Sequence, residues 1–172
     1  MDYDQAWPAR FARESRRIRG ALGAAAIAIE HVGSTSVPGL AAKPIVDIVV
    51  AVVDSADDAA YGPPLEGAGY ALVIREPDWH EHRMFEDTAT HVHVFTAGDP
   101  EIARMVAFRD RLRDDEDDRE RYAAAKRRLA ARRWRHVQHY ADAKVGRGRA
   151  DPRAGAVLTR PGAPAASRRR PW

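Results

Sequence analysis

The sequence predicts an α+β domain in which a mixed or antiparallel β-sheet is flanked by helices and followed by a C-terminal helical segment. Apolar residues have helical spacing at the start of the chain, run together or alternate as in strands through its middle, and return to helical spacing afterwards. Hydrophobic residues make up 45% and charged residues 31% of the 172 residues, which is usual for a globular domain. The absence of cysteine excludes disulfides, thiolate metal sites and a cysteine nucleophile.

The first third of the chain is expected to contain one helix and two strands. The helix, over residues 4–22, is indicated by apolar side chains that share one face: Trp7, Phe11, Ile18 and Leu22. A short apolar run predicts a strand over residues 26–32. The strongest strand signal covers residues 45–53, which are β-branched and almost wholly apolar, so this strand is expected to be buried on both faces.

The rest of the body is expected to contain three more strands and then helices. A loop or short helix over residues 55–67 is interrupted by Pro63 and Pro64. Strands are predicted over residues 70–75, 82–86 and 91–95, and helices over residues 100–113, 117–133 and 136–145. His80 and His82, near Trp79, are also interpreted as loop residues, although His82 begins the predicted strand over residues 82–86.

The charge is divided unevenly along the chain. Residues 146–172 contain seven arginines and one aspartate, which leaves residues 1–145 slightly acidic although the whole chain carries +3. The same segment is rich in proline, glycine and alanine and holds too little apolar area to fold on its own. We therefore predict one domain over residues 1–145 and a basic, disordered tail over residues 146–172. Nucleic acid is expected to bind through this tail only, if at all.

Nothing in the sequence indicates a membrane protein or a secreted one. There is no run of about 18 apolar residues. The first residues, Met1-Asp2-Tyr3-Asp4, have neither the basic start nor the apolar stretch of a signal peptide. A cytoplasmic protein is expected.

One loop combines residues that could bind a phosphorylated ligand. It begins at a glycine, continues with three hydroxyls and ends with a lysine: Gly33, Ser34, Thr35, Ser36 and Lys43. Glycine allows close approach of the backbone, N–H groups and hydroxyls suit phosphate oxygens, and lysine adds a positive charge. The alternative is a tight connection whose hydroxyls cap their own backbone.

Asp47 is the one charged residue in the predicted strand over residues 45–53. A carboxylate among apolar strand residues is costly to bury unless it is paired or bound to a metal ion. Asp47 is therefore the predicted catalytic residue and the first candidate metal ligand.

Residues 31–48 closely resemble the signature of the GrpB family, small bacterial proteins assigned to the nucleotidyltransferase superfamily. Further family motifs are similar to residues 108–113, to the strand His91-Val92-His93-Val94, and to the pairs Tyr122/Lys126 and Tyr140/Lys144. The resemblance covers about residues 1–145. The chain departs from it at Gly62-Pro63-Pro64, where a helix is expected, and in the arginine-rich tail.

The resemblance implies a nucleotidyltransferase-like sheet in which a Gly-Ser turn lies near two carboxylates of the next strand. Gly33, Ser34 and Asp47 match this pattern, but Val49 occupies the second acidic position. Alternate strand residues share a face, so one arm of the expected two-metal clamp is missing.

Histidines could complete a site for a single metal ion. His91 and His93 share one face of their predicted strand, and neutral imidazole is a common metal ligand. If the sheet brings the strands together, Asp47, His93 and either His31 or His91 would hold one divalent ion, with magnesium, manganese and zinc as candidates. The alternative is that His31 and His91 are hydrogen-bonded within the fold.

The leading functional hypothesis is binding of a small-molecule nucleotide or phosphorylated metabolite, with metal-dependent nucleotidyl transfer to a small acceptor as its catalytic form. In this scheme the loop at residues 33–36 and Lys43 hold phosphates, and Arg109 of the second family motif neutralises charge. The alternative, which Val49 favours, is a non-catalytic ligand-binding or accessory module, so the sequence leaves open whether the chain is an enzyme. Some members of the family it resembles are fused to dephospho-coenzyme A kinase, which associates that family with coenzyme A metabolism.

Overall fold

The structure is a computed structural model that describes residues 1–130. Residues 1–119 form one compact unit, and a second unit begins at Glu120. The predicted helix over residues 136–145, the predicted tail over residues 146–172 and the boundary between them lie outside the described residues.

The order of the elements confirms the predicted α+β class. The helices and strands are, in chain order, α1 (Trp7–Leu22), β1 (Ala28–Val32), β2 (Val46–Val52), α2 (Gly62–Gly67), β3 (Ala71–Glu76), β4 (His82–Glu86), β5 (Thr90–Thr96), α3 (Pro100–Asp114) and α4 (Glu116–Ala130). A short 3-10 helix at Ser34–Ser36 lies in the loop between β1 and β2.

The five strands form one mixed sheet in the order β1-β2-β5-β4-β3. Strands β2 and β5 are parallel neighbours, and the other three pairs are antiparallel. In the parallel pair Asp47 lies opposite His91 and Val49 lies opposite His93. This register decides which polar side chains meet.

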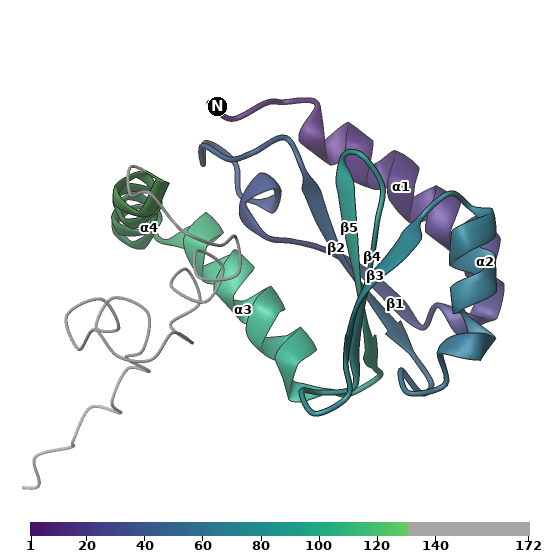
Figure 1. Cartoon of the computed structure of the whole chain (residues 1–172). Coiled ribbons are helices and arrows are strands. Elements are labelled where there is room, and N and C mark those ends of the chain that lie inside the picture. The colour runs from purple at the N-terminus through teal and green to yellow at the C-terminus, as the bar shows by residue number, and fades with distance from the viewer. Residues whose placement is uncertain (131–172) are drawn as a thin grey trace, which may run out of the picture. The chain divides into compact units, whose positions relative to one another are not determined.

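Helices cover both faces of the sheet, as Figure 1 shows for α1 and α2 on one side and α3 on the other. The larger core lies between the sheet and the first two helices and includes Ile18, Leu22, Ile48, Val50, Leu65, Phe85, Val92 and Val94. The opposite face packs on α3 and includes Val32, Val49, Phe95, Ile102, Met105 and Val106. Strand β2 is therefore buried on both faces, as predicted, and only its second residue, Asp47, is partly exposed.

The prediction that Pro63 and Pro64 interrupt a helix is wrong, because α2 begins at Gly62 and the two prolines occupy its first turn. The first N–H groups of a helix have no carbonyl partner within it, so proline loses nothing there.

Two polar clusters fix loops and helices to the sheet. In the first, Glu14 of α1 accepts hydrogen bonds from Arg17 and from the hydroxyl of Tyr70, each at 2.9 Å, and Arg17 also reaches Asp87. These contacts tie α1 to the loops beside β3 and β5.

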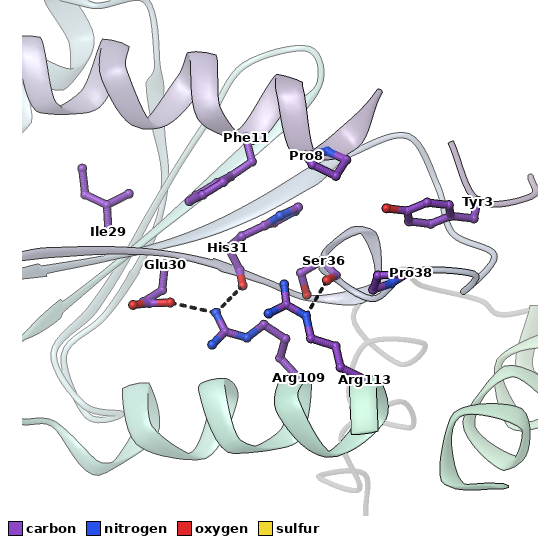
Figure 2. A pocket seen from close by; sticks show the side chains of 10 residues that line it. All are labelled: Tyr3, Pro8, Phe11, Ile29, Glu30, His31, Ser36, Pro38, Arg109 and Arg113. Carbon is purple, nitrogen blue, oxygen red and sulfur yellow. Dashed lines mark hydrogen bonds and ion pairs between the residues drawn. The ribbon is translucent and has the colours of Figure 1, made fainter. Parts of the chain in front are cut away.

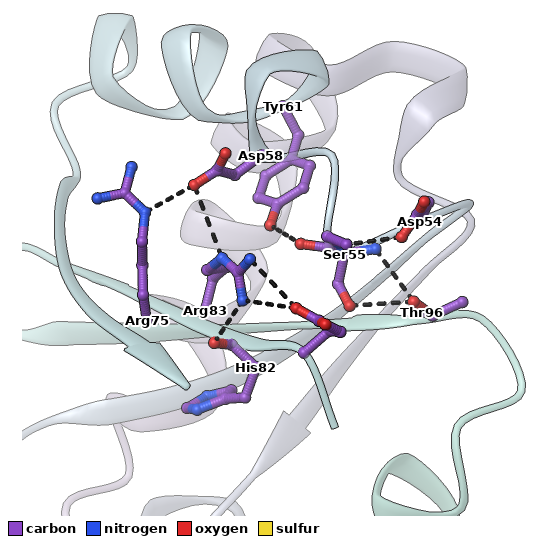
Figure 3. Close-up of polar contacts among 10 residues, drawn as sticks. Asp54, Ser55, Asp58, Tyr61, Arg75, His82, Arg83 and Thr96 are labelled. Atoms are coloured by element: carbon purple, nitrogen blue, oxygen red, sulfur yellow. Dashed lines mark hydrogen bonds and ion pairs between the residues drawn. The ribbon is translucent and has the colours of Figure 1, made fainter. Parts of the chain in front are cut away.

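The second cluster surrounds Arg83 of β4 (Figure 3). Asp58 lies 2.8 Å from Arg75 and 3.6 Å from Arg83, and Glu81 lies 3.3 Å from Arg83. Beside them the hydroxyl of Tyr61 donates to the carbonyl of Ser55 at 2.7 Å. This Arg83 cluster holds the segment after β2 against the sheet.

Among residues 1–130, no helix combines the length and apolar character needed to cross a membrane.

Candidate functional site

Three ligand-type side chains of β2 and β5 meet on the face of the sheet that also carries Val49 and Phe95. Because the two strands are parallel and in register, Asp47, His91 and His93 share this face. Asp47 Oδ1 lies 3.1 Å from His91 Nδ1 and 3.9 Å from His93 Nε2. The predicted pairing of Asp47 with His93 is thus matched by their positions, and His91 is the histidine that completes the group.

One ligand atom from each residue lies within 4.8 Å of the other two. The three side chains are between 18% and 29% exposed, so solvent or a ligand can reach them. Two imidazole nitrogens and one carboxylate oxygen form a recognised ligand set for zinc, iron or manganese, with coordination positions left for other ligands. The donor set therefore fits one divalent ion, and we call these three residues the Asp47 triad.

Among residues 1–130, a second ion has no comparable ligand set at this site. Val49, at the second acidic position of the resembled pattern, is buried and packs with Val32 and Phe95. A clamp of two carboxylates on β2 is absent from the described strand.

Gly33 holds the turn after β1 directly against the Asp47 carboxylate. Its backbone has φ +69° and ψ −171°, a conformation that is essentially restricted to glycine. A Cβ atom at this position would lie 2.2 Å from Asp47 Oδ2. The sequence therefore needs glycine here both for the turn and for the space that Asp47 occupies.

The hydroxyls of this turn are buried and partly engaged within the fold. Thr35 Oγ1 lies 3.1 Å from His31 Nε2, and the hydroxyl of Ser36 donates to the carbonyl of Gly33. Ser34 is buried as well. Ser36 thus caps the backbone of its own loop, as the alternative interpretation described, whereas Thr35 bonds the ring of His31 on β1. Lys43 is exposed in the loop that leads into β2.

His31 is not part of the triad, which corrects its prediction as a metal ligand. Strand β1 pairs with β2 so that His31 lies opposite Ile48, and it therefore faces the side of the sheet covered by α1. Its ring stacks on Phe11 at 4.7 Å and meets Thr35. Burial lowers the pKa of His31 to about 4, and the positive charge of Arg113 acts in the same direction.

Arg109 lies apart from the triad, where carboxylates hold it, and its role as a phosphate ligand stays a prediction. Its guanidinium bonds Glu30 at 2.7 Å, the carbonyl of His31 at 3.0 Å and both oxygens of Asp110. These bonds place it across the exposed edge of β1, where it lines an open cavity of about 380 Å³ together with Arg113 (Figure 2). The hydrogen bonds to Asp110 raise the pKa of Arg109, so the charge is permanent but already balanced.

A row of side chains that was not predicted from the sequence continues from the triad across β4 and β3. His82 Nε2 lies 3.0 Å from His93 Nδ1, and His82 Nδ1 lies 2.7 Å from Glu76 Oε2. On the other side, Glu86 Oε2 lies 3.6 Å from His91 Nε2. His82 is buried and is the first residue of β4, which confirms the predicted strand over residues 82–86, and its interpretation as a loop residue is wrong. The alternation of His82, Met84 and Glu86 along the strand was the signal that could have revealed this row.

Comparisons with known proteins agree on the relatives of this chain. The family model described as "GrpB protein" matches residues 1–146. A UPF0157 protein of Halalkalibacterium halodurans is 58% identical over 146 residues, which are 84% of this chain and 75% of the relative. The crystal structure of the conserved protein GrpB from Enterococcus faecalis superposes with a TM-score of 0.75 at 28% identity, over 91% of this chain and 93% of that one. A dephospho-CoA kinase of Mycolicibacterium paratuberculosis is 30% identical over 169 residues, which are 82% of this chain and 42% of the kinase.

Proposed function

The chain belongs to the GrpB family, and we propose that it binds one divalent transition-metal ion at the Asp47 triad and, through that ion, a nucleotide or another phosphorylated small molecule. The observation that carries the proposal is the position of the turn at Gly33, which packs against the same carboxylate that faces His91 and His93. A ligand-type cluster and a glycine turn suited to phosphate oxygens thus adjoin each other.

The donor atoms favour particular metals. Imidazole nitrogen suits zinc, iron and manganese, whereas magnesium prefers oxygen ligands and retains several waters. With two histidines and one aspartate, we expect zinc or manganese to bind more tightly than magnesium. Coordination positions that the protein leaves open would accept phosphate oxygens.

Two further observations support a phosphorylated ligand. Lys43 is exposed four residues before Asp47 and carries a positive charge that suits phosphate. The similarity to a dephospho-CoA kinase supports ligands of the coenzyme A type, such as dephospho-coenzyme A, as the first compounds to test.

Nucleotidyl transfer is the second candidate, and the turn at Gly33 and Ser34 beside Asp47 is the observation that favours it. A two-ion mechanism requires ligands for two metal ions that lie about 3.5–4 Å apart. Val49 occupies the position of the second carboxylate, so one of these ligands is missing. We therefore place binding before transfer. Release of pyrophosphate from ATP in the presence of the metal would move transfer to first place.

Titration calorimetry with zinc, manganese and magnesium tests the metal, and thermal shift with ATP or dephospho-coenzyme A tests the ligand. At a hundred times its dissociation constant, a ligand stabilises the protein by about 2.7 kcal/mol. We expect zinc-dependent stabilisation that Lys43→Ala weakens and that Arg16→Ala, which removes an exposed cation of α1, leaves unchanged. Ligand shifts that are equal with chelator and with zinc would contradict the proposal.

A further inference from the structure

His82 links His93 of the triad to the carboxylate of Glu76 on β3, the edge strand of the sheet. Its side chain is only 4% exposed, and its two nitrogens face Glu76 at 2.7 Å and His93 at 3.0 Å. Its ring stacks between neighbours, at 4.8 Å from Phe95 and 5.2 Å from His93, with the edge of Trp79 also at 5.2 Å. Packing on these sides fixes the orientation of the His82 ring.

Glu76, at the end of this row, determines which atom donates and which accepts in each of its hydrogen bonds. An ionised carboxylate can only accept hydrogen bonds, so Glu76 requires the proton of His82 on Nδ1. In a neutral ring the other nitrogen, Nε2, is then an acceptor. His93 must donate to it, and its own proton is therefore on Nδ1.

This assignment leaves the lone pair of His93 on Nε2, the nitrogen that faces Asp47 at 3.9 Å. A metal ion can bind only a nitrogen that carries no proton. Metal-bound histidines commonly donate their other N–H to such an acceptor, and changes at the acceptor weaken metal binding about 10–100-fold.

We propose that Glu76 and His82 are positioning residues that hold His93 in the tautomer whose Nε2 faces the metal. The inference rests on the proposed function, because it concerns the same ion. It adds two residues of β3 and β4 that do not touch the ion to the residues that determine its affinity.

The Glu86 side of the row is built differently. Glu86 is 42% exposed and its oxygen is 3.6 Å from His91 Nε2, beyond hydrogen-bond distance. The structure therefore indicates that His82 fixes the orientation and tautomer of His93 more strongly than Glu86 fixes those of His91.

Zinc affinity and the tautomer of His93 test the inference together. His82→Leu removes the acceptor, and we expect zinc to bind about 10–100-fold more weakly. His82→Gln places an amide oxygen near the position of Nε2 and should recover most of the affinity. Glu76→Ala changes a half-exposed residue, so it should fold, and zinc should again bind more weakly, by about tenfold. His80→Gln is the matched control, because His80 also pairs with a carboxylate, Asp99, but has no contact with His93.

The spectroscopic measurement is a long-range ¹H–¹⁵N correlation spectrum of the metal-free protein at about pH 8, where an unperturbed imidazole is neutral. We expect His93 to be protonated on Nδ1 in the parent and to lose this preference in Glu76→Ala. Protonation of His93 on Nε2 in the parent, or unchanged zinc affinity in His82→Leu, overturns the inference and leaves the proposed metal site standing. A parent that binds no zinc overturns the proposed function itself, so the two failures are distinguishable.

Discussion

Asp47 and Asp58 are two carboxylates with similar exposure and different partners. The Asp47 side chain is 23% exposed and faces the imidazoles of His91 and His93, whereas Asp58 is 27% exposed and faces the guanidinium groups of Arg75 and Arg83. The hydrogen bond from Arg75 lowers the pKa of Asp58. A permanent cation satisfies a carboxylate without help. The imidazole of His91 donates its Nδ1–H to Asp47 at 3.1 Å in the metal-free protein, and on losing that proton it can bind the same ion as the carboxylate.

The surroundings of the two carboxylates differ in the same way. In the Arg83 cluster (Figure 3) the guanidinium of Arg83 also reaches Glu81 and the carbonyl of His82, so opposite charges are paired within the protein. In the Asp47 triad three ligand atoms converge within 4.8 Å. Exposure and residue type therefore do not separate a structural carboxylate from a candidate ligand, but the chemistry of the partners does.

The largest effect is expected from Gly33→Ala, which disturbs the surroundings of Asp47. The added Cβ would clash with the Asp47 carboxylate and the backbone conformation is unsuitable for alanine, so we expect a loss of about 3–5 kcal/mol in unfolding free energy. Zinc affinity should fall about 100-fold, as in metal sites whose supporting residues are changed.

The control for this variant is Gly39→Ala. Gly39 also has a positive φ, of +77°, but a Cβ there would have no neighbour within 4 Å. It should cost only the conformational part, about 1–3 kcal/mol, and leave zinc binding intact. Equal zinc affinities in both variants would contradict the role of Gly33 beside Asp47.

A smaller loss of unfolding free energy is expected from Asp58→Asn, which disrupts the ion pairs of Asp58 with Arg75 and Arg83. The substitution removes the charge that faces the buried Arg83, so unfolding in urea should show a loss of about 2–3 kcal/mol. Because the pKa of Asp58 is lowered in the folded state, the stabilisation is present above its usual pKa of about 3.8 and is lost as the pH falls further. Zinc affinity should not change. If Asp58→Asn weakens zinc binding as much as it weakens folding, the two clusters are not independent.

The smallest effect is expected from His31, which shows what burial does to an imidazole outside the triad. Its pKa is lowered from 6.5 to about 4, chiefly by burial, so the unfolded chain binds the proton more readily than the folded one. Stability is therefore full above about pH 6.5 and falls as the pH drops toward 4, by about 2 kcal/mol between pH 8 and pH 5. Urea unfolding at these two pH values should show this slope in the parent and a smaller slope in His31→Gln.

The fold could be predicted from the sequence because each element carries its own signal. The apolar run at residues 45–53 and the helical spacing of Trp7, Ile18 and Leu22 are local patterns that tertiary packing reinforces. The parallel pairing of β2 with β5 has no such local signal, since it depends on where a distant strand is inserted.

The candidate site could be predicted only within single strands. Alternation placed His91 beside His93, but the choice between His31 and His91 depends on the register of β1, which no local pattern reveals. Glu76 and His82 were missed for the same reason, because they meet only across a hairpin. The partners of Arg109 could not be predicted, because a long side chain selects among several carboxylates and only the tertiary structure shows which are near.

The central claim is that Asp47 binds a metal ion, whereas Asp58 is paired with two side chains of the protein, Arg75 and Arg83. The most direct test is the melting temperature of the parent, Asp47→Asn and Asp58→Asn, each measured with chelator and with zinc or manganese. We expect the metal to raise the melting temperature of the parent and of Asp58→Asn but not of Asp47→Asn, which with chelator should be at least as stable as the parent because it removes a partly buried charge. A parent that does not respond to any of these metals, together with an Asp47→Asn variant that is destabilised in every condition, would show that Asp47 is structural and would contradict the account.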